Sequence, residues 1–163
     1  TSYLEVDDSL VPNGRIAPVG GTLLDFSEKA RLIEERTYDV EPSGYDHCYV
    51  LDQDASKFRI DPEEVKKAVE VWSPVTGIKL TMSTTEPAFQ FYAGSKIIDG
   101  HVPKKSQSTD DSVRVGSYSG FCLEAQRFPD AINNKQWSKQ VTLSSGQQYK
   151  QVTVYKFETS DHI

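Results

Sequence analysis

The sequence contains little cysteine and no long apolar run, and each shortage excludes a class of protein. Its 163 residues include two cysteines, Cys48 and Cys122, too few for the disulfide framework of a small secreted domain. We therefore expect reduced thiols and a cytoplasmic location. No stretch approaches the roughly 18 consecutive apolar residues of a membrane-spanning helix. The sequence predicts neither a disulfide scaffold nor a membrane span.

Positive charge is also scarce. Lysine and arginine number 18 against 24 acidic residues, which gives a formal net charge of −6 and a pI near 5.1. A protein that binds a nucleic-acid backbone needs a basic patch to neutralise phosphates, and Lys104 with Lys105 is too small a cluster for that. The length predicts one domain or part of one, because domains run to roughly 100–200 residues.

Apolar and polar residues alternate with a period of two in much of the chain. The alternation is clearest in Ile78–Met82, Phe89–Tyr92, Phe121–Gln126 and Val152–Tyr155. Successive side chains of a strand point to opposite faces, so the pattern predicts strands with one buried face. Glycine-containing turn signals separate these runs. The sequence therefore predicts an all-β fold of the antiparallel sandwich type.

Two segments interrupt this pattern with helix-forming residues. Phe26–Glu35 predicts a short helix with Ser27 as its N-cap. Pro62–Val69 is ambiguous, because Asp61 can cap a helix that has proline at its first position. Strand-forming residues dominate Val69–Trp72, and we predict a strand there.

An aspartate follows a Pro-Ser-Gly turn at the start of a predicted strand. Asp46 shares one face of that strand with Cys48 and Val50, whereas His47 lies on the other face with aromatic neighbours. A carboxylate placed there can accept charge-assisted hydrogen bonds from two hydroxyl groups. The alternative interpretation is an aspartate that caps the turn beside a surface histidine.

A glutamate stands in the middle of an apolar run. Glu124 is flanked by Leu123 and Ala125, and a carboxylate among apolar groups is costly to desolvate unless it is paired. Such a group is a paired structural ion or a catalytic acid or base with a raised pKa. A solvated outer face is the alternative, because Gln126 lies on the same face of the strand.

A third candidate is an amide opposite two phenylalanines. Gln90 and Tyr92 alternate with Phe89 and Phe91, and the amide offers both a donor and an acceptor to a polyhydroxyl ligand. The polar outer face of a sandwich strand is again the alternative. The sequence has no phosphate-binding glycine loop and no nucleophile elbow, and its three histidines lack the spacing of a metal site.

Three segments resemble the galactose mutarotase (aldose 1-epimerase) family and occur in the family's order. They are Gly44-Tyr-Asp-His47, Phe89-Gln-Phe-Tyr-Ala-Gly94 and Gly120-Phe-Cys-Leu-Glu-Ala-Gln-Arg-Phe-Pro-Asp-Ala131. Supporting matches run from Leu10–Val19 to Thr153–Phe157, so the resemblance extends over nearly the whole chain. This sequence departs from the family at Ala125, where threonine is common, and at Ser95-Lys96, where asparagine is common.

The resemblance implies a large antiparallel β-sandwich, the galactose mutarotase-like supersandwich, of which residues 1–163 form roughly the C-terminal half. Family members are longer, and their two active-site histidines lie in the N-terminal half that this chain lacks. The expected partners are that missing half and, as in some fungi, a fused UDP-galactose 4-epimerase domain. We expect the 163 residues alone to be inactive and poorly soluble or oligomeric, because half a sandwich leaves apolar faces and strand edges uncovered.

The resemblance also implies a reaction, the interconversion of the α and β anomers of hexoses such as galactose or glucose by acid–base ring opening. Glu124 then resembles the base that takes the proton of the anomeric hydroxyl, and Asp46 and Gln90 resemble contacts to the monosaccharide. We expect the apolar neighbours of Glu124 to raise its pKa. The acid is expected to be a histidine of the missing half, and the reaction needs no metal or redox cofactor.

Two alternative functions use the same residues differently. A non-catalytic carbohydrate-binding sandwich would keep the aromatic and amide contacts without needing Glu124. A hexose-6-phosphate epimerase-like protein would need an arginine cluster for the phosphate group. Only Arg114 and Arg127 flank the glutamate motif, which favours a neutral sugar.

Overall fold

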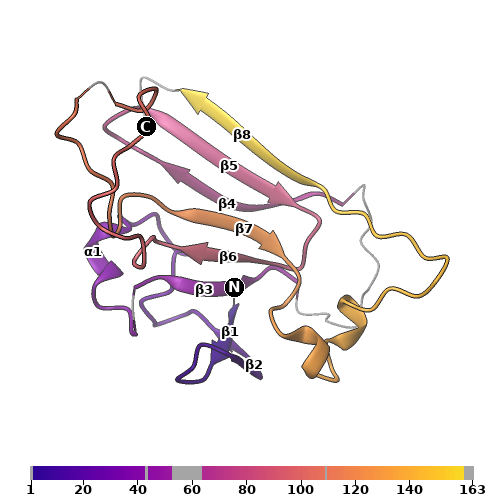
Figure 1. Ribbon diagram of the computed structural model, residues 1–163. Coiled ribbons are helices and arrows are strands. Elements are labelled where there is room, and N and C mark those ends of the chain that lie inside the picture. The colour runs from indigo at the N-terminus through magenta and orange to yellow at the C-terminus, as the bar shows by residue number, and fades with distance from the viewer. Residues whose placement is uncertain (1, 43, 53–63, 109, 160–163) are drawn as a thin grey trace. The chain divides into compact units, whose positions relative to one another are not determined.

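The computed structural model describes residues 2–42, 44–52, 64–108 and 110–159, and the regular secondary structure of this part of the chain is mainly β-strand (Figure 1). The strands are β1 Ser2–Val6, β2 Pro12–Pro18, β3 Asp46–Val50, β4 Lys66–Trp72, β5 Ile78–Thr84, β6 Ala88–Tyr92, β7 Cys122–Gln126 and β8 Thr153–Thr159. The helical elements are α1 Glu34–Thr37 and the short 3₁₀ turns η1 Ala131–Asn133 and η2 Ser138–Gln140.

These strands form two sheets. The first has five strands in the order β2-β1-β3-β6-β7, and the second has three in the order β4-β5-β8. The strand pairs β1–β2, β1–β3, β4–β5 and β5–β8 are antiparallel. The all-β prediction is therefore confirmed, and strands lie where the sequence alternation predicts them. The predicted strand at Val69–Trp72 is the C-terminal part of β4, whereas Asp61 and Pro62 lie outside the described residues.

The helix predicted at Phe26–Glu35 is wrong for most of its length. Only one helical turn, α1, forms at its C-terminal end. Ser27 does not cap a helix, because its backbone N–H and its hydroxyl both donate to Oδ1 of Asp25, at 2.9 and 2.6 Å. Short polar side chains that hydrogen-bond locally offer the backbone an alternative to the helix, and the buried Asp25 side chain takes that option here.

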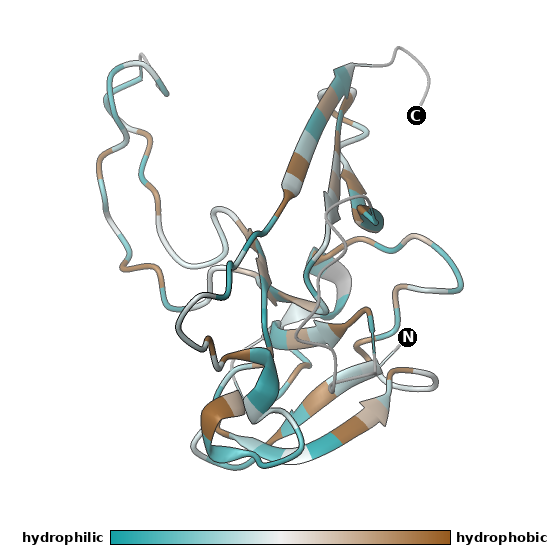
Figure 2. Cartoon of the chain, turned by 90° about the vertical axis from the view of Figure 1, so that its right-hand side faces the viewer, coloured by the Kyte–Doolittle hydropathy of each residue, from teal (hydrophilic) through white to brown (hydrophobic). Residues whose placement is uncertain are grey.

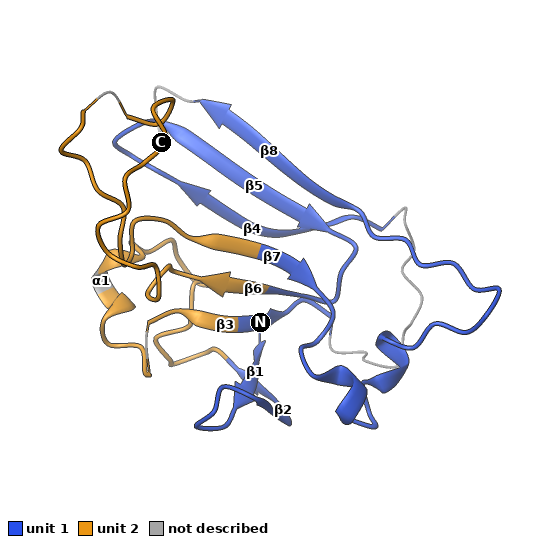
Figure 3. Ribbon diagram, viewed as in Figure 1, with its two compact units in different colours: residues 1–18, 48–89, 124–163 blue, residues 19–47, 90–123 orange. Residues whose placement is uncertain are grey.

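The chain divides into two compact units (Figure 3). Unit 1 comprises residues 1–18, 48–89 and 124–163, and unit 2 comprises residues 19–47 and 90–123. The core of unit 1 contains Leu4, Cys48, Val50, Ala88, Phe128, Ala131 and Trp137. Unit 2 has an aromatic core, in which Tyr45 stacks on Phe91 with ring centroids 5.2 Å apart and Phe26 packs against both rings.

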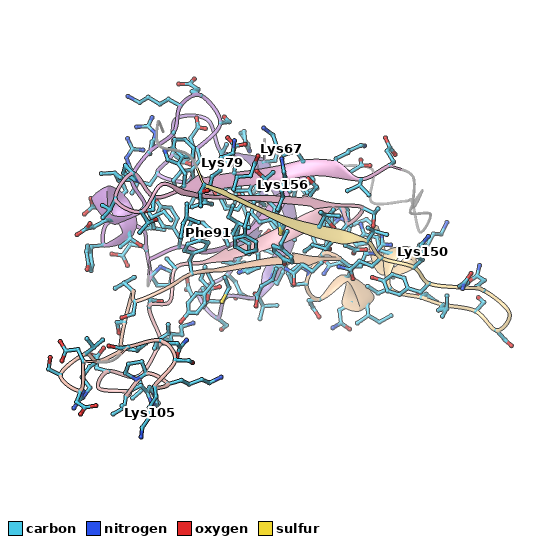
Figure 4. All side chains as sticks on the ribbon, turned by 90° about the horizontal axis from the view of Figure 1, so that it is seen from above. Lys67, Lys79, Phe91, Lys105, Lys150 and Lys156 are labelled. Atoms are coloured by element: carbon cyan, nitrogen blue, oxygen red, sulfur yellow. The ribbon has the colours of Figure 1, made fainter. Side chains whose placement is uncertain are left out.

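The three-stranded sheet of unit 1 has one apolar face and one charged face. Residues that are paired across β4, β5 and β8 point to the same side of an antiparallel sheet, so the register defines each face. The apolar face carries Val69, Val71, Leu80, Met82, Tyr155 and Phe157. The charged face includes the ion pairs Lys79–Glu70 and Lys156–Glu158, whose lysines are labelled in Figure 4. Figure 2 shows the alternation as brown and teal bands along the strands.

Part of that apolar face is open to solvent on strand β8, which is an edge of the sheet. Phe157 is 68% exposed and Tyr155 is 48% exposed, although Met82 on the central strand is fully buried. Contiguous exposed apolar groups beside an open strand edge mark a surface that another chain or segment covers. The structure thus agrees with the expectation of an uncovered apolar face.

We expect the 163-residue chain to self-associate at micromolar concentration and Phe157→Lys to weaken that association. Burying a phenylalanine side chain is worth about 1.5–3 kcal/mol, and the substitution removes that gain from the apolar face. Val154→Lys is the matched control, because it puts the same charge on the same edge strand but on the charged face. Sedimentation velocity reports the association state. A monodisperse wild-type monomer would contradict the expectation.

Candidate functional site

Two of the three predicted site residues, Asp46 and Gln90, are hydrogen-bonded to each other in unit 2. The Nε2 amide of Gln90 on β6 donates a hydrogen bond of 2.8 Å to Oδ1 of Asp46 at the start of β3. Phe89 and Phe91 are buried, whereas Gln90 and Tyr92 are half-buried, so the predicted alternation is confirmed. The amide holds the carboxylate in one orientation, because a hydrogen bond to an ionised group is stronger and more directional than a neutral one.

A tight turn and an aromatic platform place Asp46. Gly44 has a φ of +79°, and a Cβ atom there would lie 3.1 Å from Tyr118 and from the carbonyl oxygen of Thr37. Glycine is the residue that accepts both the conformation and the close approach. The next residue, Tyr45, is fully buried on Phe91 and donates its hydroxyl to the carbonyl of Leu23 at 3.1 Å. Burial raises the pKa of Tyr45, so its hydroxyl remains a donor at neutral pH.

His47 stabilises the start of β3. Its Nδ1 accepts the backbone N–H of Asp46 at 3.1 Å, so the proton of the neutral ring is assigned to Nε2. Burial lowers the pKa of His47, and the charge of Asp46 opposes that change only in part. The ring is therefore neutral at pH 7, and its Nδ1 is already occupied.

A lysine that the sequence analysis did not assign to the site completes this cluster. The Nζ atom of Lys96 lies 3.5 Å from Oδ2 of Asp46. The backbone N–H of Lys96 donates to the hydroxyl of Tyr92 at 2.6 Å. The two carboxylate oxygens of Asp46 thus face different donors, Gln90 on one side and Lys96 on the other. A carboxylate has about four lone-pair sites, so both oxygens retain capacity for ligand hydroxyls.

Glu124 lies in unit 1 on β7, and its side chain is exposed. The expectation that apolar neighbours enclose this carboxyl group is wrong. Leu123 is buried, but adjacent residues of a strand point to opposite faces, so the neighbours in sequence are not the neighbours in space. Gln126, two residues along on the same face, donates from Nε2 to Sγ of the buried Cys48 at 3.7 Å. Burial raises the pKa of Cys48 to about 12, so this thiol is an inert packing group.

The backbone beside Glu124 is held from the C-terminal segment. Nε2 of Gln151 donates a hydrogen bond of 3.2 Å to the carbonyl oxygen of Ala125, the residue after Glu124. The hydroxyl of Tyr149 lies 3.1 Å from Oε1 of Gln151 and 3.2 Å from Oε1 of Glu86. These contacts connect the middle of β7 to a polar network in unit 1.

A buried ion pair forms the centre of this network. Nε of Arg127 lies 3.1 Å from Oε2 of Glu86, and the two side chains are 11% and 0% exposed. The contact is an ion pair without the alignment of a hydrogen bond. The guanidinium group also lies over the ring of Tyr149, with 5.8 Å between Cζ and the ring centroid. Burial raises the pKa of Glu86, and the charge of Arg127 opposes that rise.

The structure brings together two of the three predicted site residues, Asp46 and Gln90, and it shows Glu124 to be accessible. Sequence reasoning missed Lys96, whose only signal was a departure from the family pattern at Ser95-Lys96. It also missed the Glu86–Arg127 pair, which no local spacing reveals.

Among the described residues, no group of three metal-ligating side chains lies close enough to hold a metal ion. None of the helices within the described ranges is long and apolar enough to cross a membrane.

Comparison with known proteins gives matches along nearly the whole chain. The family model described as aldose 1-epimerase matches residues 1–156. The bifunctional protein gal10 of Schizosaccharomyces pombe is 44% identical over 108 residues, which are 65% of this chain and 13% of that protein. The galactose mutarotase of Rattus norvegicus is 34% identical over 160 residues, which are 98% of this chain and 42% of the rat protein.

A solved structure supports the same relationship. The crystal structure of a GalM/aldose epimerase homologue from C. elegans matches with a TM-score of 0.73 and 27% identity over 98% of this chain. The match covers 44% of that structure's chain. The predicted fold class is therefore confirmed. The present chain spans less than half the length of the rat and nematode proteins.

Proposed function

This chain belongs to the aldose 1-epimerase family, and we propose that it forms the C-terminal part of a mutarotase domain that interconverts the anomers of hexoses such as galactose or glucose. The observation that carries the proposal is the 2.8 Å hydrogen bond between Gln90 and Asp46. It joins, across 44 residues of sequence, the two residues that the family resemblance assigns to the sugar.

In the proposed reaction, Glu124 is the base. Its carboxylate takes the proton of the anomeric hydroxyl, the bond between the anomeric carbon and the ring oxygen breaks, and an acid protonates that oxygen. Rotation of the resulting aldehyde and ring closure by the reverse steps give the other anomer, so no atoms are gained or lost. The exposed side chain of Glu124 supports this role, since a base must reach the proton that it removes.

The acid lies outside this chain in our proposal. The family resemblance assigns it to a histidine of the N-terminal part, and His47 does not replace that residue because burial lowers its pKa and leaves the ring neutral, which makes it a poor proton donor. Asp46 and Gln90 bind and orient the sugar, and the hydrogen bond between them lies within unit 2.

Asp46→Ala tests the binding half of the proposal. We expect KM for galactose to rise by about 10- to 100-fold, with a smaller change in kcat, because a hydrogen bond to a charged group contributes about 1.5–3 kcal/mol. Polarimetry of freshly dissolved α-D-galactose with the full-length protein measures both constants. Asp39→Ala is the control, an exposed aspartate of the same unit.

The polarimetric assay also decides between classes of function. Acceleration of the change in optical rotation by the wild-type protein is the expected result. Galactose binding without acceleration would instead favour a non-catalytic carbohydrate-binding sandwich. Faster turnover of galactose 6-phosphate than of galactose would favour the sugar-phosphate alternative.

We further propose a cytoplasmic protein that is joined to a second enzymatic domain. The match to a protein named bifunctional, of which the aligned region is 13%, supports a fusion with a UDP-galactose 4-epimerase domain. Both described cysteines, Cys48 and Cys122, are free thiols, which is consistent with a reducing compartment.

A further inference from the structure

We propose that Lys96 is a third sugar-contacting residue, which forms with Asp46 a clamp for two neighbouring hydroxyl groups of a neutral hexose. The inference rests on the proposed function, and it adds to that function a residue that sets substrate preference. The juxtaposition of an ammonium group and a carboxylate, 3.5 Å apart, is the observation behind it.

The ammonium group has free capacity at this position. The Lys96 side chain is 57% exposed and that of Asp46 is 25% exposed, and an ammonium group carries three N–H donors. An exposed ion pair contributes at most about 1 kcal/mol to stability. The Lys96–Asp46 pair therefore contributes little to the stability of the fold, and both side chains remain accessible to a ligand.

The backbone around Lys96 is fixed, which distinguishes this lysine from a flexible surface residue. Its N–H donates to Tyr92, and the hydroxyl of Ser117 lies 3.1 Å from the carbonyl oxygen of Ser95 and 3.2 Å from that of Ile97. The residues on both sides of Lys96 are thus tied to another loop of the same unit. Preorganised groups lose less conformational entropy when a ligand binds.

The chemistry of the pair favours a diol. A hydroxyl group donates one hydrogen bond and accepts others, so one hydroxyl can donate to Oδ2 of Asp46 while its neighbour accepts from Nζ of Lys96. The two charges sum to zero, so the pair offers no net attraction to an anionic group. A phosphate close enough to reach Lys96 would also meet the Asp46 carboxylate, which opposes a sugar-phosphate substrate.

Calorimetric binding of galactose and its monodeoxy derivatives to the full-length protein tests the clamp. We expect Lys96→Met to weaken galactose binding by about 5- to 20-fold and Lys96→Arg to retain most of the affinity. One monodeoxygalactose lacks the hydroxyl that Lys96 contacts, and Lys96→Met should not weaken its binding further. Lys105→Met is the matched control, since this lysine, labelled in Figure 4, is also exposed and lies in a turn. Thermal unfolding checks that each variant is folded.

Several outcomes would overturn the clamp. Unchanged galactose affinity in Lys96→Met would remove Lys96 from the site. An equal loss for every deoxy sugar would mean a general effect on the site instead of one hydroxyl contact. A larger loss for galactose 6-phosphate than for galactose would assign Lys96 to anion binding. If the wild-type protein binds no hexose, the proposed function fails together with the clamp, whereas binding and rotation activity that are insensitive to Lys96→Met defeat the clamp alone.

Discussion

Glu124→Gln is expected to lower the kcat of anomer interconversion by about 10²–10⁴-fold, the range that a positioned base contributes. Glutamine keeps the size of the side chain but has no carboxylate to take the anomeric proton. Because the binding groups Asp46 and Gln90 are unchanged, KM should move far less than kcat. Polarimetry with the full-length protein measures both constants.

The stability of the Glu124 variant separates catalysis from folding. Glu124 is exposed, and substitutions of exposed side chains usually change the free energy of unfolding by no more than about 0.5 kcal/mol. We therefore expect a large loss of rate with an unchanged melting temperature. Glu28→Gln, an exposed glutamate of unit 2, should leave both quantities unchanged. Wild-type kcat in Glu124→Gln would eliminate Glu124 as the base.

The exposure of Glu124 also shows that the sequence of a single strand does not reveal whether one of its faces is buried. The alternation rule correctly separated Gln90 from Phe89 and Phe91, because each decision there concerns one strand and its two faces. Applied to Glu124, the same rule puts Leu123 on the opposite face, so the apolar neighbours in sequence provide no apolar surroundings. Whether a given face is covered depends on other segments, and that information is not local.

Long-range contacts account for the rest of what the sequence analysis missed. Lys96 and Asp46 are separated by 50 residues, and Glu86 meets Arg127 from a distant loop. Each of these residues is an ordinary charged residue in its own segment. The helix predicted at Phe26–Glu35 is absent for a local reason instead. The backbone N–H and the hydroxyl of Ser27 donate to the Asp25 side chain, so Ser27 does not cap a helix.

Arg127→Met is expected to destabilise the protein by about 3–5 kcal/mol, because removing one member of a buried ion pair leaves the other charge without compensation. The Glu86 side chain is 0% exposed, and the hydroxyl of Tyr149 would still donate to its Oε1 atom. Denaturant-induced unfolding of the full-length protein measures the loss. Glu86→Gln combined with Arg127→Met should recover much of it, since a neutral pair needs no counter-charge.

A solvent-exposed ion pair provides the control. Nζ of Lys66 lies 2.9 Å from Oε1 of Glu64, and the two side chains are 55% and 63% exposed. Such exposed ion pairs contribute at most about 1 kcal/mol to the free energy of unfolding. Lys66→Met should therefore cost far less than Arg127→Met, although it removes the same charge. An equal loss of unfolding free energy in the two variants would mean that burial does not determine how much the Glu86–Arg127 pair contributes to stability.

The pH dependence of the Arg127 variant gives an independent measure of the same buried charge. Burial raises the pKa of Glu86 above its ordinary value of 4.5, so the folded state binds this proton more tightly than the unfolded state does. The stability that Glu86 contributes is present below its ordinary pKa and is lost as pH rises through the raised one. Without the cation of Arg127 the pKa of Glu86 rises further, so the deficit of Arg127→Met should be large at pH 7 and smaller at pH 5. Glu86→Gln should abolish this difference between the two pH values, because the glutamine has no proton to lose. A deficit that is equal at both pH values would show that Arg127 stabilises the protein through packing and not through the charge of Glu86.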